Sequence, residues 1–157
     1  MKTTINIGID PTKTDELIAA LNGLLANYQI IYQNLRGSHW NVKGRSFFEL
    51  HVQFETMYTT AAFKVDAIAE RILTLGGNPT HKFVDYLRAA RIKESPTTCN
   101  GEEIVQNAVM NFAEIIRLER EVLQIAQKAE DEGTATLLTD DITALEKQQW
   151  MLHAYLG

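Results

Sequence analysis

Four side chains that can bind metal ions recur along one stretch of helical pattern: His51, Glu55, Asp66 and Glu70. At 100° per residue they fall at roughly 0°, 40°, 60° and 100° around a helix axis, so they share one stripe. Along the axis, His51 and Asp66 are roughly 22 Å apart, and Glu55 and Asp66 roughly 16 Å. Because the ligands of one metal centre must converge within a few ångström, the rest of any such site has to come from another helix.

The simplest source is a second copy of the same helix, running antiparallel across a two-fold axis. That arrangement places His51 and Glu55 of one chain opposite Asp66 and Glu70 of the other, twice. A second histidine, His39, extends the apolar stripe of the preceding segment. Imidazole and carboxylate together suit iron, manganese or zinc, and a set with unfilled coordination positions suits redox iron better than structural zinc. The pattern therefore predicts a metal site and a dimer together.

A second interpretation of these residues stays open at this point. A histidine on an apolar face is more often a hydrogen-bonded core residue, and acids four residues apart on a helix usually face solvent. Glu55 follows Phe54, however, and Asp66 follows Val65, so both acids border an apolar stripe and need partners.

The motif of an intrachain di-iron centre, Glu-x-x-His on two helices, is missing from the sequence. The residues three before the four histidines are Arg36, Phe48, Asn78 and Trp150. An intrachain ferritin-type centre is therefore disfavoured, which again points to a site between chains.

Composition indicates one domain, residues 1–157, with residues 1–10 as a short N-terminal tail. Hydrophobic residues make up 45% and charged residues 22%, which is ordinary for a globular protein. No apolar run is long enough to cross a bilayer, and the first residues lack the apolar stretch of a signal peptide. A lone cysteine, Cys99, lies in a turn-forming segment and is interpreted as an incidental loop thiol. We therefore expect a cytoplasmic protein without a membrane partner.

Hydrophobic periodicity predicts four long helices and one short one. The first long helix begins at Asp10-Pro11 and ends at Lys43-Gly44. Ser46 and Glu49 form a capping box at the start of the second long helix, which ends at Gly76-Gly77. Asn100 caps the third long helix, and residues Glu130 to Gly133 separate it from the fourth. A short helix is expected within 81–92. The core face of the third long helix is expected to carry Ile104, Val109, Phe112, Ile116, Leu123 and Ile125. We predict an all-α, ferritin-like four-helix bundle with a short extra helix in the connection between the second and third long helices.

Four dispersed segments carry a family resemblance in the right order and spacing. They are Asn34 to Gly44, Phe47 to His51 with Phe54-Glu55, Asp66 to Ile72, and Leu75 to Pro79. Together they closely resemble the Dps family, the ferritin-like mini-ferritins named for DNA protection in starved cells. The motifs cover about a third of the chain, and the helical pattern around them, including the closing Trp150, matches the rest.

The resemblance implies a hollow homododecamer built from two-fold dimers, with a di-iron ferroxidase centre (Fe(II)/Fe(III)) at each two-fold interface. The implied metal ligands are His39, His51 and Glu55 of one subunit with Asp66 and Glu70 of its neighbour, and all of these except Glu55 are expected to be catalytic. The implied function is an iron-storage ferroxidase that oxidises Fe(II), preferably with hydrogen peroxide, and protects against oxidative stress.

Two further groups of residues have open roles. Trp40, beside a ligand, resembles a family tryptophan that takes up an oxidising equivalent, while simple interface packing is an equal alternative. Four acids near the last break, Glu130, Asp131, Asp140 and Asp141, are candidates for pore or inner-surface charge, with solvation at helix ends the favoured interpretation.

The charge balance argues against nucleic acid as a partner. The net charge is −5, the N-terminal segment holds only Lys2 and Lys13, and twelve copies would carry about −60. We expect no strong DNA binding at neutral pH and moderate salt. The alternatives are a DNA- or nucleoid-binding or structural cage with little ferroxidase activity, and a manganese or zinc buffer that uses the same ligands.

Overall fold

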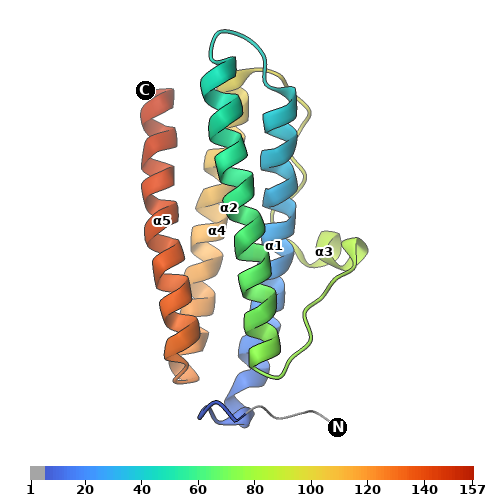
Figure 1. The fold of residues 1–157 in the computed structure, drawn as a ribbon, viewed down its shortest axis with the longest axis vertical. Coiled ribbons are helices and arrows are strands. Elements are labelled where there is room, and N and C mark those ends of the chain that lie inside the picture. The colour runs from blue at the N-terminus through green and yellow to red at the C-terminus, as the bar shows by residue number, and fades with distance from the viewer. Residues whose placement is uncertain (1–5) are drawn as a thin grey trace.

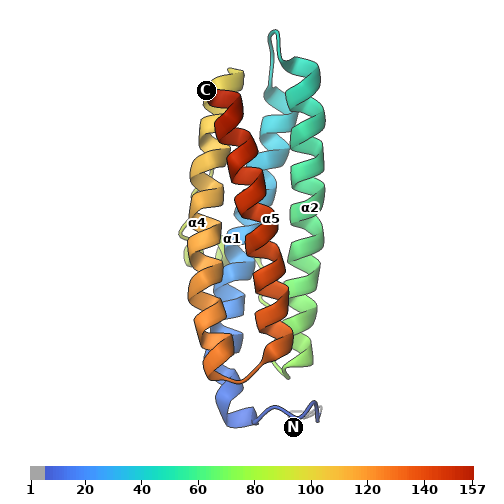
Figure 2. The same ribbon diagram turned by 90° about the vertical axis from the view of Figure 1, so that its left-hand side faces the viewer.

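The computed structural model describes residues 6–157, so residues 1–5 of the expected tail lie outside the described part. Its helices are η1 (Pro11–Lys13), α1 (Thr14–Asn41), α2 (Phe47–Thr74), α3 (Phe83–Ala89), α4 (Gly101–Lys128) and α5 (Glu132–Leu156). The four long helices lie side by side, and α3 stands beside α1 in the connection from α2 to α4 (Figure 1). That connection runs the length of the bundle, so α2 and α4 point the same way (Figures 1 and 2). The predicted all-α, ferritin-like bundle with a short extra helix is confirmed.

Most helix ends fall where the turn residues predict them. Asp10 caps η1 by accepting from the Thr12 N–H, and Asn100 caps α4 by accepting from the Glu103 N–H. Beyond α2, Gly76 adopts a φ of +84°, a left-handed conformation that costs glycine little. The capping box at Ser46 is wrong: Ser46 does precede α2, but its side chain makes no capping hydrogen bond.

The core lies between the four long helices, and α1 supplies its most regular stripe. Every position predicted for that stripe is buried: Leu17, Leu21, Leu24, Tyr28, Ile31, Leu35 and His39. The face predicted for α4 is confirmed at Ile104 and Phe112 and only in part at its other four positions. Its buried residues are Ile104, Val105, Ala108, Phe112, Ile115, Leu118, Glu119, Val122 and Ala126, whereas Val109, Ile116, Leu123 and Ile125 are half-buried. Large apolar residues occur on more than one face of α4, so hydrophobicity alone does not show which face is buried. Two small alanines, Ala108 and Ala126, and the charged Glu119 occupy core positions on this helix.

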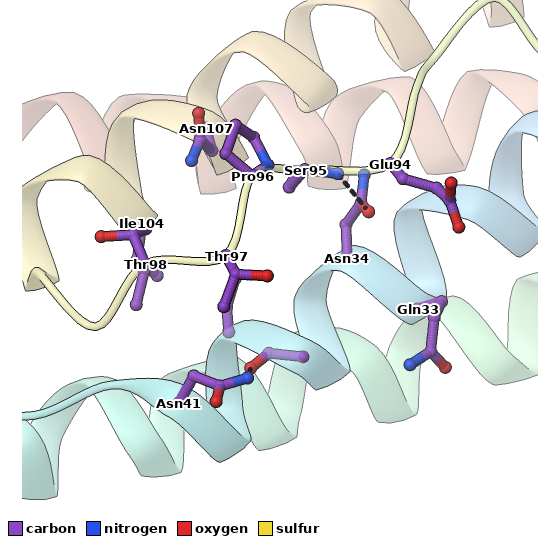
Figure 3. A pocket seen from close by; sticks show the side chains of 12 residues that line it. Gln33, Asn34, Asn41, Glu94, Ser95, Pro96, Thr97, Thr98, Ile104 and Asn107 are labelled. Atoms are coloured by element: carbon purple, nitrogen blue, oxygen red, sulfur yellow. Dashed lines mark hydrogen bonds between the residues drawn. The ribbon is translucent and has the colours of Figure 1, made fainter.

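Two buried asparagines of α1 hold the long connection against the bundle. The Asn27 side-chain oxygen accepts from the Arg91 and Ile92 N–H groups, both at 2.9 Å. Asn34 donates to the Lys93 carbonyl and accepts from the Ser95 N–H, beside a polar pocket of about 180 Å³ (Figure 3). These contacts satisfy backbone groups that the non-helical segment cannot pair with itself.

Ion pairs join α2 to α5 and correct the interpretation of two of the four acids, Asp131 and Asp141. Asp131 is buried, caps α5 by accepting from the Thr134 N–H, and pairs with Arg71 at 2.6 Å. Burial opposes the ionisation of Asp131, but the hydrogen bonds from Arg71 and Thr134 outweigh it and lower the pKa. Asp141 is also buried and pairs with Lys64. Neither acid is a solvated helix-end charge.

The other two acids lie at the surface. Glu130 pairs with Lys13, whereas Asp140 is exposed without a role that the fold explains.

Cys99 is a free, exposed thiol, and its backbone carbonyl accepts a hydrogen bond from the Lys43 N–H. Within residues 6–157, none of the helices combines the length and the apolar character needed to cross a membrane.

Candidate metal centre

Two histidines from different helices meet where α1 ends and α2 begins. The rings of His39 and His51 are stacked, with centroids 3.7 Å apart and an interplanar angle of 19°. His39 Nδ1 lies 2.7 Å from the His51 carbonyl oxygen, and His51 Nδ1 lies 2.8 Å from the His39 carbonyl oxygen. A carbonyl oxygen can only accept, so each Nδ1 must carry the proton and donate it. In the neutral rings, both Nε2 atoms therefore keep the lone pair that binds a metal ion.

Neighbouring aromatic rings fix the orientation of this pair. The Phe47 ring stacks on His51 at 4.9 Å, so His51 lies between Phe47 and His39. The Tyr58 ring meets His39 edge-on at 5.3 Å. Packing on both sides restricts ring rotation, and together with the reciprocal hydrogen bonds it holds the two Nε2 atoms in fixed positions.

The three acids predicted as ligands all lie on α2 and are exposed: Glu55, Asp66 and Glu70. Glu55 is one helical turn from His51, whereas Asp66 and Glu70 lie more than three turns farther along the same helix. In the described residues of a single chain, no three His, Cys, Asp or Glu side chains form a group that could hold an ion. One chain thus brings together His39 and His51 and leaves Asp66 and Glu70 apart from them.

Trp40 follows His39 at the end of α1, and its side chain is 57% exposed. The Arg36 guanidinium lies 4.8 Å from its ring centroid and 5.7 Å from that of Tyr32. The geometry is that of a cation–π contact, which places a fixed positive charge over the indole.

A buried polar cluster inside the bundle escaped the sequence reasoning. The Tyr28 hydroxyl of α1 donates to the Glu119 carboxylate of α4, which is 0% exposed. Burial raises the pKa of Glu119 to about 7, although the Tyr28 hydrogen bond and the Lys64 charge act in the opposite direction. Burial also raises the pKa of Tyr28, and the neighbouring carboxylate raises it further. A signal was available: Glu119 continues the step of three or four residues from Phe112 and Ile115 on the core face of α4.

Comparisons with known proteins show the family to which this chain belongs. Residues 18–157 match the family model of the ferritin-like domain. The DNA protection during starvation protein of Porphyromonas gingivalis is 39% identical over 156 residues, which cover 99% of this chain and 98% of that protein. The chain belongs to the Dps family.

Solved structures of Dps proteins share the whole fold. The DPS protein of Vibrio cholerae O1, described as a member of a broad superfamily of ferritin-like diiron-carboxylate proteins, is 46% identical, with a TM-score of 0.95 and coverage of 100% of this chain and 98% of that chain. A Dps protein from Bacillus brevis is 36% identical, with a TM-score of 0.90 and coverage of 93% and 98%. As a Dps-family protein with this fold, the chain falls among ferritin-like, iron-binding proteins.

Proposed function

We propose that this Dps-family protein is a ferroxidase that oxidises Fe(II), preferably with hydrogen peroxide, and stores the ferric product inside a hollow homododecamer. The proposal depends above all on the reciprocal His39 and His51 hydrogen bonds, which hold two Nε2 lone pairs ready for a metal ion. We assign His39, His51 and Glu55 of one subunit, with Asp66 and Glu70 of its two-fold neighbour, as ligands of the shared iron centre.

The outer face of α2 supports a second copy as the missing partner. Large apolar side chains lie exposed on the same stripe as the acids, within roughly 80° around the axis. They are Phe48, Val52, Phe63 and Leu73, and Phe48 and Phe63 are 78% and 72% exposed. An apolar stripe of this kind on a helix surface is typical of an interface between chains. Pairing two such stripes antiparallel brings the histidines of each chain to the acids of the other.

The ligand types suit the chemistry of the substrate ions. Carboxylates bind both Fe(II) and Fe(III), and the low number of protein ligands leaves positions for peroxide. Peroxide accepts two electrons, one from each Fe(II), so its reduction proceeds without release of hydroxyl radical. The reaction removes peroxide and Fe(II) together and stores the ferric product inside the cage. Removal of both reactants is what defence against oxidative stress requires.

The first test is kinetic. Fe(II) is added anaerobically to the assembled protein, and hydrogen peroxide follows in steps while ferric absorbance is recorded against an air-only control. We expect rapid oxidation that is complete at about half an equivalent of peroxide per iron, since one peroxide takes two electrons. His51→Ala and Asp66→Asn should each abolish the fast phase, whereas Glu49→Gln, an exposed acid on the same helix, should keep it. Oxidation at the buffer rate in the unmodified protein would refute the proposal.

A second test asks whether the centre is shared. Chains with His51→Ala and chains with Asp66→Ala are inactive alone but, in a mixed dimer, leave one centre with both residues intact. Random co-assembly should therefore restore about a quarter of the parent activity, because half the dimers are mixed and each regains one of two centres. Intrachain centres would give no recovery, since every chain then lacks one ligand.

The remaining parts of the proposal concern place and partners. We place the protein in the cytoplasm, and we propose that it does not bind DNA at neutral pH and moderate salt, because its net charge of −5 per chain repels phosphates. A clear gel shift under those conditions would contradict this. Binding of Mn(II) or Zn(II) at the same ligands without peroxide-dependent oxidation of Fe(II) would favour a metal buffer instead.

A further inference from the structure

A row of aromatic rings leads from the paired histidines into the bundle. The Tyr58 ring of α2 is 5.3 Å from His39, and the Tyr32 ring of α1 is 6.0 Å from Tyr58, both edge-on. Tyr28 lies four residues before Tyr32, one turn along the same helix, where side chains are neighbours. We define Tyr58, Tyr32 and Tyr28 as the tyrosine row. It links the candidate metal centre to the buried carboxylate of Glu119.

The inner end of the row is built for loss of an electron together with a proton. Tyr28 is 3% exposed, and its hydroxyl already donates to Glu119. A phenol that gives up an electron must also give up its proton, and a base within hydrogen-bond distance can take that proton without any movement. Because burial raises the pKa of Glu119 to about 7, its ionised form is a stronger base than an ordinary carboxylate.

The outer aromatic residues are less suited to hold an oxidising equivalent. The Arg36 guanidinium lies over the Trp40 ring, where its charge opposes a positive charge on the indole. Arg36 also donates to the Tyr32 hydroxyl at 3.2 Å, and among residues 6–157 no base accepts the Tyr32 proton. In the described part of the chain, Tyr28 alone among the three tyrosines of the row combines burial with a carboxylate acceptor.

We propose that Tyr28 is a redox-active residue that supplies one electron, through Tyr32 and Tyr58, when peroxide meets a centre holding a single Fe(II). The O–O bond of hydrogen peroxide breaks as it takes two electrons and becomes two hydroxide ions. One electron comes from Fe(II), which becomes Fe(III), and the other from Tyr28. The Tyr28 O–H bond breaks, the proton passes to Glu119, and a neutral tyrosyl radical and a neutral carboxylic acid remain.

A later Fe(II) reverses the change in the protein. It gives one electron to the tyrosyl radical and becomes Fe(III), and Glu119 returns the proton to the phenolate oxygen. The sum is two Fe(II) and one peroxide converted to two Fe(III) and two hydroxide ions, as when two irons react at once. Tyr28 thus stores one oxidising equivalent inside the bundle instead of releasing hydroxyl radical. This step depends on the proposed function, since Fe(II) must bind beside His39 and His51.

The test with iron uses the assembled protein loaded anaerobically with about one Fe(II) per centre, mixed with peroxide and freeze-quenched for electron paramagnetic resonance. We expect a tyrosyl radical in the parent protein and its loss in Tyr28→Phe, which keeps the ring in the core. Tyr86→Phe is the matched control, because Tyr86 is buried and hydrogen-bonded to the Thr80 carbonyl but lies outside the row. Spin-trapped hydroxyl radical should rise in Tyr28→Phe and stay at the parent level in Tyr86→Phe.

A second arm needs no iron and separates this inference from the proposed function. The metal-free assembled protein is oxidised by a one-electron photo-oxidant in solution, and the tyrosyl yield is followed from pH 5 to 9. The yield should increase as pH rises through about 7, because Glu119 must be ionised to accept the proton. The groups facing Glu119 are Tyr28 from α1 and Lys64 from α2, and Lys64 is itself paired with Asp141 of α5.

Glu119→Gln should lower the tyrosyl yield and remove its rise with pH, because the amide keeps an acceptor for the Tyr28 hydroxyl but cannot take its proton. A tyrosyl yield and pH profile unchanged in both Tyr28→Phe and Glu119→Gln would overturn the inference, whatever the ferroxidase assay shows. A normal photo-oxidation result with no peroxide-driven iron oxidation would instead uphold the redox role of Tyr28 and refute the ferroxidase proposal.

Discussion

The buried carboxylate of Glu119 makes the stability of the fold depend on pH in a definite direction. Its pKa is about 7 in the folded protein, against an ordinary value of 4.5 for an exposed glutamate. Below pH 4.5 both folded and unfolded chains hold this proton, so the carboxyl adds no pH-dependent cost. Between the two pKa values the folded chain holds a proton that the unfolded chain releases, and stability falls as pH rises. Above about pH 7 both are ionised, and the difference of about 2.5 pKa units amounts to about 3 kcal/mol.

Replacing Glu119 with glutamine removes this cost while keeping the side-chain size and an acceptor for Tyr28. The free energy of unfolding of the parent and of Glu119→Gln is measured by urea denaturation at one fixed protein concentration, between pH 5 and pH 8. Relative to the parent, the variant should gain about 2.5 kcal/mol per chain between pH 5 and pH 8, because a small part of the cost is already present at pH 5. The matched control is Glu121→Gln on the same helix, an exposed acid paired with Arg91, which loses the same charge.

Two outcomes decide the matter. A gain confined to Glu119→Gln supports a buried acid that is neutral at low pH and ionised at a cost at high pH. Parallel pH profiles for the parent and Glu119→Gln would refute the reasoning, since the folded pKa would then equal the unfolded one. A carboxylic acid C=O band that persists to about pH 7 in the infrared spectrum of the parent and is missing in the variant would give independent evidence.

Backbone packing and the long connection give two further predictions. Gly77→Ala should destabilise the fold by about 1–3 kcal/mol, because the new Cβ would lie 2.6 Å from the Ile18 Cγ2 atom. The control Gly23→Ala lies in α1, where the new Cβ would have nothing within 4 Å, and it should stabilise the fold by about 0.5–1 kcal/mol. Equal shifts of the thermal unfolding midpoint in the two variants would contradict the packing at Gly77. Asn27→Ala should cost about 2 kcal/mol or more, because two backbone N–H groups of the connection lose their acceptor. Asn41→Ala, at an exposed site, should be close to neutral in the same thermal unfolding assay, and a similar loss there would count against the role of Asn27.

The architecture could be predicted because it depends on local signals. The stripe from Leu17 to His39 repeats every three or four residues, and such a stripe has one buried face in any helical bundle. Asn100 and Gly76 mark helix ends through their own backbone and side-chain geometry. The α4 face could not be read in the same way, because four large apolar residues of this helix are only half-buried: Val109, Ile116, Leu123 and Ile125.

The candidate site was predictable as a set of residue types and only partly as a geometry. Spacing along α2 places Glu55, Asp66 and Glu70 on one stripe, and the structure keeps all three exposed on that helix. The reciprocal bonds between His39 and His51 join side chains to carbonyls twelve residues away on another helix. No periodicity within one helix encodes such a contact.

By itself, the sequence determined the helices, their order, and a stripe of metal-binding types too extended for one ion. These properties follow from rise and rotation per residue, which are the same in every α-helix. Only the tertiary structure decided which polar groups interact. The Nδ1 atoms of His39 and His51 donate to backbone carbonyls, the Tyr28 hydroxyl donates to Glu119, and Lys64 pairs with Asp141. The reason is that a pKa or a tautomer depends on burial and on neighbours within a few ångström, and in a bundle those neighbours come from distant parts of the chain.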